Sequence, residues 1–430
     1  MRNLILLIVL LSAVDGFSQQ LRLQDAVNAA LKNSLDIQLV KNNLQISTIN
    51  NHIGVAGGLP LVTGSASDRE QLTNVNQKLN TGTIIQRNGA VANNLNADVT
   101  GSILLYNGFR VVATKKRLEE IEKQSEEYVN AQIQNTMAAA MTAYFDVIRQ
   151  QSYTKAIVYS IDAAQKKLDI VRAQQNAGMA NNADLFQAQL ELNTLLQTKQ
   201  SQQMITEQAK TELLRVMGVR SDSVVSIEDT ILVDRSLTLD ATLNSIHRNA
   251  EILAADYQVR INEQIVKETA ALRYPSLLGN AGVNYGRSQT SAGNLLLNQS
   301  YGPFIGLGLA IPIYNGSVYK RQQKIAEINT RNAEVQKDIL LRDYKAAIVK
   351  NFQSYASNQQ QLETQQKNLD LAQQLVNLVL QRFQLRQATI VDVTIAQQSY
   401  ENAAYSLVNY NFAAKAAEIE LKRLSNQLTY

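Results

Sequence analysis

The sequence contains the tripeptide Tyr-Asn-Gly twice, in LLYNGF at residues 104–109 and in PIYNGS at residues 312–317. In both places an apolar stretch ends near the tyrosine, and a long charged stretch begins after the glycine. Asn-Gly favours a turn because both residues tolerate a positive φ. The two copies lie 208 residues apart, so the chain is predicted to turn in the same way at two corresponding points.

The segments after these turns are predicted to be very long helices, over about 109–177 and 317–385. No glycine or proline occurs between Gly108 and Gly178, and none follows Gly316, so no residue interrupts either helix. Each helix would be roughly 100 Å long at 1.5 Å per residue. Apolar residues recur every seven positions, which is typical of coiled-coil seams. They are Ile133, Ala140, Val147, Thr154, Ile161 and Leu168 in the first helix, and Tyr355, Leu362, Leu369, Val376 and Phe383 in the second.

Each long helix is expected to reverse at a short break and continue as a return helix, over about 183–217 and 391–427. The breaks read NAGMANNADLFQAQ and QLRQATIVDVTIAQ, and their aspartates, Asp184 and Asp392, are again 208 residues apart. The same spacing of 78 residues from turn to aspartate in both copies indicates a tandem duplication. We expect a first repeat at 19–220, an equatorial linker at 221–235 and a second repeat at 236–430.

Strands are predicted in the two windows that contain all four prolines, near residues 54–108 and 273–316. Over Leu95–Leu105 the odd positions are apolar or small and the even positions are mostly polar, a period of two typical of strands. We expect strands at about 59–73, 95–106, 275–289 and 301–314, with a long loop around 74–94. About 9 to 11 residues cross a bilayer obliquely. Four strands cannot close a membrane barrel, which needs about eight, so we expect copies of the chain to associate.

Composition excludes several other classes of protein. The net charge of +4 comes from 41 basic and 37 acidic residues spread along the chain, so nucleic acid is not an expected partner. The absence of cysteine excludes disulfides, thiolate metal sites, a cysteine nucleophile and a lipid-modified cysteine. The two histidines, His52 and His247, have no neighbours at ligand spacing. We therefore predict no catalytic site, cofactor or metal, and no enzyme.

The amino-terminal stretch MRNLILLIVLLSAVDGFSQQ has the features of a secretory signal peptide. Arg2 precedes an apolar run from Leu4 to Leu11, and small residues follow at Gly16 and Ser18. We assign the signal peptide to residues 1–18. The run is shorter than the roughly 20 residues of a spanning helix. The exported protein is thus expected to enter a membrane only through its strands, because a closed barrel satisfies backbone groups in lipid.

With these features in place, the sequence resembles the TolC-like outer-membrane efflux factors over nearly its whole mature length. The matching features are the opening LQDAVNAALKNSLDI at 23–37, both Tyr-Asn-Gly turns, and TIVDV at 389–393 followed by Ala396 and Gln397. The resemblance implies a mainly α fold with a membrane β-barrel part. Three copies of the two-repeat chain would form a homotrimer with one 12-stranded barrel in the outer membrane and an α-helical barrel in the periplasm.

The resemblance also implies a function and partners. The protein would be the exit duct of a tripartite efflux or type I secretion system and would perform no chemistry itself. Its partners would be two further copies, a periplasmic adaptor protein, an inner-membrane pump and outer-membrane lipid. The heptads and hairpins also fit a periplasmic or surface coiled-coil protein without a pore, which salt rather than detergent would extract. The signal peptide, the missing cysteines and the duplication favour the channel.

In the family the helix tips narrow the pore and meet the adaptor, which implies roles for residues near both breaks. Asp392 matches the first of two tip aspartates, and Ile395 stands in place of the second. Gly178 matches the tip glycine, whereas Arg386 replaces it in the second hairpin, which leaves the geometry of that turn open. A ring of aspartates would attract cations; alternatively, Asp184 and Asp392 cap the return helices.

The predicted site residues form three groups. The pore constriction comprises Asp392, Asp184 and Arg386; the adaptor-docking tip comprises Gly178, Met179, Ala180, Ala388, Thr389 and Ile390; the strand-to-helix turns comprise Tyr106, Asn107, Gly108, Tyr314, Asn315 and Gly316.

Overall fold

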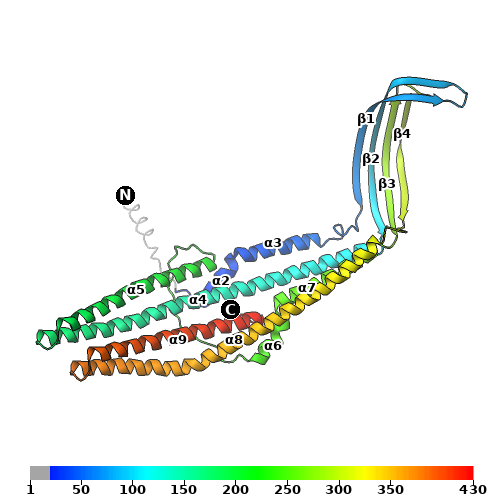
Figure 1. Cartoon of the computed structure of the whole chain (residues 1–430). Coiled ribbons are helices and arrows are strands. Elements are labelled where there is room, and N and C mark those ends of the chain that lie inside the picture. The colour runs from blue at the N-terminus through cyan, green and yellow to red at the C-terminus, as the bar shows by residue number, and fades with distance from the viewer. Residues whose placement is uncertain (1–19, 430) are drawn as a thin grey trace, which may run out of the picture. The chain divides into compact units, whose positions relative to one another are not determined.

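The computed structural model describes residues 20–429, so the predicted signal peptide lies outside the described residues. The first repeat contains α2 (Leu23–Asn33), α3 (Leu35–Asn50), β1 (Leu61–Lys78), β2 (Ile84–Tyr106), α4 (Arg110–Asn176) and α5 (Asn182–Val216). The second contains α6 (Leu239–Ser245), η1 (Ile246–Arg248), α7 (Ala250–Ala271), β3 (Ser276–Thr290), β4 (Leu297–Ala310), α8 (Val318–Gln384) and α9 (Ile390–Leu424). Figure 1 labels these elements.

The chain divides into two compact units. One comprises the chain up to Asn42, Glu127–Leu253 and the chain from Asp338 onward, and it holds both helix tips. The other comprises Asn43–Glu126 and Ala254–Lys337, and it holds the whole sheet.

The two helical hairpins have matching dimensions. Helices α4 and α8 are each 67 residues long, and α5 and α9 are each 35 residues long. Each boundary in the first hairpin recurs 208 residues later in the second. The duplicated spacing seen in the sequence is therefore retained at both ends of all four helices.

Both long helices end with the same hydrogen-bonded turn. The N–H of Met179 donates to the carbonyl of Gln174, and the N–H of Gln387 donates to the carbonyl of Arg382. These bonds define the helix-terminating motif in which one residue takes a left-handed conformation. Gly178 has φ 73° and Arg386 has φ 64°. The substitution of arginine for glycine thus leaves the backbone of the second turn unchanged.

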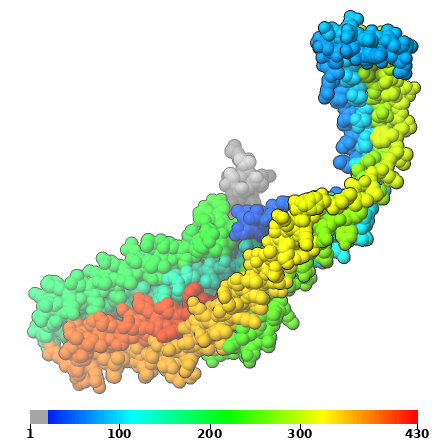
Figure 2. Space-filling view, turned by 45° about the vertical axis from the view of Figure 1, so that its right-hand side comes forward, coloured from blue at the N-terminus to red at the C-terminus, as the bar shows by residue number. Residues whose placement is uncertain are grey.

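The predicted seams are buried where the hairpins pack together. Ala140 and Val147 of α4 lie in one hydrophobic cluster with Ala26 and Val27 of α2. Nearer the tips, a second cluster joins Leu168 of α4 to residues of α5, α8 and α9, among them Leu192, Val376, Phe383 and Val393. Figures 1 and 2 show the α4–α5 and α8–α9 hairpins lying side by side there. The seven-residue rhythm thus marks the faces along which the two hairpins pack.

The strands form one antiparallel sheet in the order β1-β2-β3-β4. Leu61 pairs with Ser102 in the first hairpin, and Ser276 pairs with Ala310 in the second. The edges of the sheet are β1 and β4.

The predicted loop around 74–94 is wrong, because β1 continues to Lys78 and β2 begins at Ile84. Leu72 pairs with Val91, and after a bulge the pairing continues to the end of β1. The side chain of Asn74 accepts a hydrogen bond from the N–H of Gly89 at 2.9 Å, which stabilises that bulge. Backbone pairing therefore extends through a segment whose polar side chains gave no alternating signal.

The second predicted strand of the second repeat is displaced. We expected it at about 301–314, whereas β4 covers Leu297–Ala310. Pro312 offers no N–H to a ladder and disfavours extension of the strand past this point. The strand instead begins earlier, where Leu297 pairs with Gln289.

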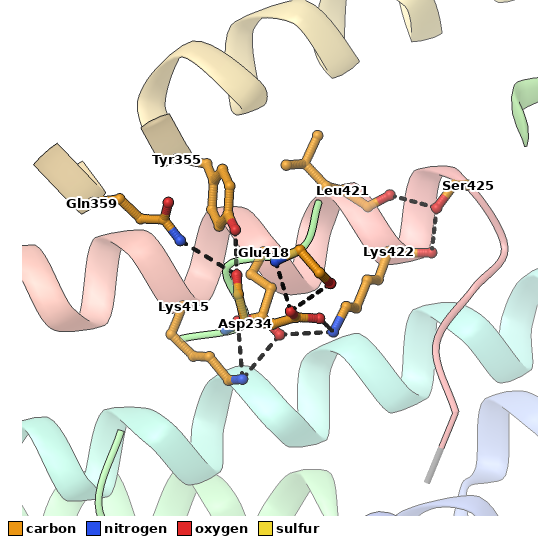
Figure 3. Close-up of polar contacts among 9 residues, drawn as sticks. Asp234, Tyr355, Gln359, Lys415, Glu418, Leu421, Lys422 and Ser425 are labelled. Carbon is orange, nitrogen blue, oxygen red and sulfur yellow. Dashed lines mark hydrogen bonds and ion pairs between the residues drawn. The ribbon is translucent and has the colours of Figure 1, made fainter. Parts of the chain in front are cut away.

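The linker between the repeats is fixed at Asp234, whose polar groups contact two helices (Figure 3). Its carbonyl accepts hydrogen bonds from the Tyr355 hydroxyl and from Gln359 Nε2. Its N–H donates to Glu418 Oε2 at 2.9 Å, and its carboxylate accepts from Lys422 Nζ at 3.0 Å. Hydrogen bonds from Ser236, followed by the contact with Lys422, hold the pKa of Asp234 well below its usual range. The linker is thus tied to both helices of the second hairpin.

Candidate functional site

The two tips begin their return helices in different ways. At the first tip Asn181 is the N-cap, and its side chain accepts the N–H of Asp184 at 2.8 Å. At the second tip Thr389 is the N-cap, and its Oγ1 accepts the N–H of Asp392 at 3.2 Å. Asn181 and Thr389 are again 208 residues apart. The caps occupy matching positions but use different chemistry.

The carboxylate that caps a helix is that of Asp392. Its Oδ2 accepts the Thr389 N–H at 2.7 Å and the Thr389 hydroxyl at 2.8 Å, which completes a capping box. These hydrogen bonds, from the N–H first and the hydroxyl second, lower the pKa of Asp392. The expectation that Asp184 caps α5 with its side chain is wrong, because Asn181 supplies that acceptor. Asp184 nevertheless lies in the first turn of α5, where a negative charge is favourable.

Arg386 connects the two tips. Its guanidinium donates to the carbonyl of Met179 at 3.4 Å, and Gln174 Nε2 donates to the carbonyl of Phe383 at 3.2 Å. The side chains of both contacts reach from one hairpin to the other. The charged group of Arg386 is therefore placed beside the first tip rather than beside Asp392 in its own turn.

The predicted docking residues differ in accessibility. Ala180, Ala388 and Ile390 are partly buried against the cluster behind the tips. Met179 is 53% exposed, and Gly178 and Thr389 are also exposed. The structure thus divides the predicted docking set into accessible residues and residues that support the turn from beneath.

Sequence reasoning missed three exposed apolar side chains near the tips. Phe186 on α5 is 61% exposed, Leu385 in the second turn is 68% exposed, and Val391 on α9 is 54% exposed. The signal for Leu385 was present, because it falls two positions after the seam residue Phe383 and so leaves the buried face. Together with Met179 these residues give the tips an exposed apolar surface.

A buried lysine lies behind the tips and was also missed. The Lys167 side chain on α4 is fully buried and forms an ion pair with Glu191 on α5. Its Nζ also donates to Thr394 Oγ1 at 3.1 Å and to Gln397 Oε1 at 2.9 Å, both on α9. Burial lowers the pKa of Lys167 despite the opposing effect of Glu191. This polar contact links the first hairpin to the second.

The strand-to-helix turns share one backbone geometry. Gly108 has φ 68° and Phe109 has φ 65°, and the second copy repeats these values at Gly316, 66°, and Ser317, 63°. The positive φ values fall on the glycine and the residue after it. At the first turn Asn107 Oδ1 also accepts the N–H of Val111 at 3.4 Å.

The sheet has two chemically distinct faces, because residues opposite one another in the register point to the same side. We call one the apolar face; it includes Val62, Ala66, Val99, Val283, Ile305 and Leu307. We call the other the polar face; it includes Ser65, Asn96, Asp98, Thr100, Asn284 and Ser300. On β4 the side chains of Ile305 and Leu307 are largely exposed. Within residues 20–429, no helix contains a stretch that is both long and apolar enough to cross a membrane.

These features define a class of tandem-repeat proteins in which a strand pair leads into a long helical hairpin twice over. The model of the family described as "Outer membrane efflux protein" matches residues 26–219 and 244–427. The chain belongs to this family, and the two matches confirm that it contains two repeats of one domain.

Individual relatives agree with this assignment. The chain is 22% identical over 412 residues to the outer membrane efflux protein BepC of Brucella suis, covering 95% of this chain and 86% of that protein. It is 20% identical over 438 residues to the proteases secretion protein PrtF of Dickeya chrysanthemi, covering 99% and 93%.

Solved structures share the fold. CusC superposes with a TM-score of 0.79 at 17% identity, covering 95% of this chain and 93% of that chain. VceC of Vibrio cholerae superposes with a TM-score of 0.78 at 17% identity, covering 95% and 97%. The predicted TolC-like fold is confirmed. The protein is an outer-membrane exit duct that extends into the periplasm, and its family consists of channels rather than enzymes.

Proposed function

We propose that three copies of the chain close one 12-stranded barrel in the outer membrane and one helical barrel in the periplasm, and that substrates pass through both without chemical change. The sheet is the observation that carries this proposal. It has one apolar face and one polar face, and both of its edge strands, β1 and β4, lack a second strand partner within the described residues. Four strands cannot close a barrel, whereas copies joined edge to edge can.

The orientation of the sheet follows from its faces. Lipid favours apolar side chains, so the apolar face points outward and the polar face lines the lumen. The strand-to-helix turns then lie at the periplasmic end of the sheet.

Conductance and mass test this assembly. The purified protein should produce stepwise ion conductance in a planar bilayer, and its mass in detergent should be that of three chains. A detergent-soluble monomer that never conducts would contradict the proposal. Extraction by salt without detergent would favour a coiled-coil protein without a pore.

We also propose that the tips dock a periplasmic adaptor, which connects the duct to an inner-membrane pump. The exposed apolar side chains of Met179, Phe186 and Leu385 support this role, because exposed apolar patches commonly form contacts with other proteins. A photo-crosslinking amino acid at Met179 should capture an adaptor in cells. The same amino acid at the exposed position Gln366, within α8, should not. Equal capture at both positions would argue against docking at the tip.

At the same tips, Asp392, Asp184 and Arg386 are proposed to line the narrowest part of the pore. The exposed carboxylate of Asp392 supports this role, because the capping box engages only its Oδ2 oxygen within the described residues.

A further inference from the structure

The polar face of the sheet carries one carboxylate along most of its length. Residues paired across the four strands form rows on this face. We consider the rows from that of Arg69 and Asn94 to that of Leu61 and Ser102. Between these rows Asp98 is the only acidic residue on this face, and Arg69, at the far end from the helices, is the only basic one.

Neutral groups hold the Asp98 carboxylate. The Ser65 hydroxyl donates to Oδ1, and the Thr100 hydroxyl donates to Oδ2 at 3.2 Å. Asn284 lies opposite Asp98 on the next strand. Among residues 20–429 no basic side chain forms an ion pair with Asp98. Its negative charge is therefore fixed in position but not neutralised by the protein.

An aromatic ring lies one row from this carboxylate. Phe304 belongs to the row of Thr100 and Gly282 and is 41% exposed. A Cβ at Gly282 would come within 3.0 Å of Phe304 Cζ, so the ring lies across the glycine and toward β2. Glycines also occupy this face at Gly286, Gly302 and Gly306, so these positions of β3 and β4 place no side chain beside the ring and the carboxylate.

We propose that Asp98 and Phe304 form a selectivity ring in the β-barrel lumen that favours cations, and in particular organic cations with apolar groups. The inference rests on the proposed function, in which three copies close the barrel with the polar face inward. Three unpaired carboxylates at one level then attract cations and repel anions. The neighbouring rings offer their faces to the apolar and cationic parts of the same molecule.

Ion selectivity tests the carboxylate. Reversal potentials are measured in planar bilayers under a salt gradient, with the wild-type protein and with Asp98→Asn, which keeps the shape but removes the charge. We expect Asp98→Asn to lower the preference for cations by at least about twofold. Asn284→Asp adds a carboxylate in the same row and should raise the preference for cations. Ser67→Ala removes a hydroxyl from the adjacent row of the same face, opposite Asn96 rather than Asp98, and serves as the matched control, with a reversal potential close to that of the wild-type protein.

Block of the channel by two organic ions of similar size and opposite charge tests the aromatic ring of Phe304. Tetraphenylphosphonium and tetraphenylborate have similar size and opposite charge. The cation should block the wild-type channel more strongly than the anion. Phe304→Leu should weaken block by the cation about two- to fivefold with little change in reversal potential. Asp98→Asn should weaken it as well.

The outcomes separate the two proposals. If the wild-type protein does not conduct, the proposed function fails. If it conducts but Asp98→Asn and Asn284→Asp both leave the reversal potential unchanged, the selectivity ring is overturned. Should Asp98→Asn fail to insert, the result with Asn284→Asp decides. Equal block of the wild-type channel by both ions, or unchanged block in Phe304→Leu, would remove organic cations from the proposal.

Discussion

At the scale of single residues, the two repeats place the same amino acid at matching positions and use it differently. Asp184 and Asp392 both stand three residues after an N-cap. Both N-cap side chains accept the N–H of the aspartate, but at the second tip the N–H of Thr389 also donates to the Asp392 carboxylate. Only Asp392 therefore completes a capping box. Aspartates at matching positions of the two repeats thus form different hydrogen bonds because their N-cap neighbours differ.

Asp392→Asn should destabilise the start of α9. It should also abolish the loss of stability that this part of the helix otherwise shows as the pH falls. The folded pKa of Asp392 is lowered by the Thr389 N–H and hydroxyl. The stabilisation it gives is therefore present above the ordinary aspartate value of about 3.9 and is lost as the pH falls through the lower folded pKa. Hydrogen exchange at the start of α9, corrected for intrinsic rates, should show this acid loss in the wild-type protein and not in the variant.

The same variant tests the proposed constriction. If Asp392 lines the pore, Asp392→Asn should change the cation selectivity or the block by divalent cations. Unchanged reversal potentials and block, together with the altered hydrogen exchange, would leave Asp392 with a capping role only.

The two strand-to-helix turns provide a matched pair of glycines. Gly108 and Gly316 have the same left-handed φ, but a Cβ at Gly108 would lie 2.7 Å from Tyr274 Cβ and 2.9 Å from the Ala271 carbonyl oxygen, whereas Gly316 faces open space. Gly316→Ala should cost about 1 kcal/mol of folding free energy from backbone strain. Gly108→Ala should cost roughly 1–3 kcal/mol more from steric crowding. Chemical unfolding in detergent measures both; equal losses would contradict the crowding.

At the scale of elements, the long helices were accessible to sequence reasoning because their signals are local. The seven-residue rhythm that includes Val147 and Val376 marks buried faces, and no glycine or proline interrupts it. The strand segments at 74–78 and 84–94 were missed because both of their faces are polar or mixed. Their pairing depends on backbone hydrogen bonds and a bulge, which leave no period in the side chains.

The tip region was predictable in position but not in detail. The repeat identified where the turns occur. It could not reveal that Arg386 contacts the other hairpin or that Lys167 reaches α9, because these contacts join residues more than 200 positions apart, such as Lys167 and Thr394. The position of Phe186 on an exposed face depends on the same packing. The spacing of apolar residues along one helix does not indicate which residues of the other hairpin it contacts.

Among the contacts that join elements, those of Glu418 should contribute the most to the free energy of folding. Its carboxylate is buried and accepts hydrogen bonds from Lys415, Lys422 and the N–H of Asp234. Glu418→Ala would leave a buried lysine uncompensated and should cost about 3–5 kcal/mol of folding free energy. Glu363→Ala removes an exposed ion pair with Lys367 and should cost less than about 1 kcal/mol. Chemical unfolding of both variants measures the difference, and similar values would show that the linker contact stabilises little.

At the scale of the whole molecule, the duplication extends to the register of the sheet. Residues 61–73 of β1 correspond to residues 276–288 of β3, 215 positions later, as Gly64 does to Gly279 and Ala66 to Ala281. Their partners on β2, residues 90–102, correspond to residues 298–310 of β4, 208 positions later. The pair Leu61 and Ser102 maps in this way onto the pair Ser276 and Ala310, which is the register observed. The two strand pairs are therefore structural copies of each other.

This equivalence predicts how β4 of one copy pairs with β1 of the next. Within the chain Gly101 on β2 pairs with Ala281 on β3. If the proposed barrel repeats this contact between copies, Leu309 on β4 should lie opposite Ala66 of the neighbouring copy. The chain has no native cysteine, so introduced pairs can be read without interference. Leu309→Cys combined with Ala66→Cys should form disulfide-linked dimers and trimers on oxidation.

The geometry also supplies the control. Within one chain β1 and β4 are separated by two strands, or about 14 Å at 4.8 Å per step, which is too far for a disulfide. Any bond must therefore join two copies. Leu309→Cys combined with Ser65→Cys shifts the register by one residue and places the thiols on opposite faces of the sheet, so it should not cross-link. Cross-linking by the shifted pair alone would disprove the predicted register, and its absence from both pairs would argue against contact between these edges.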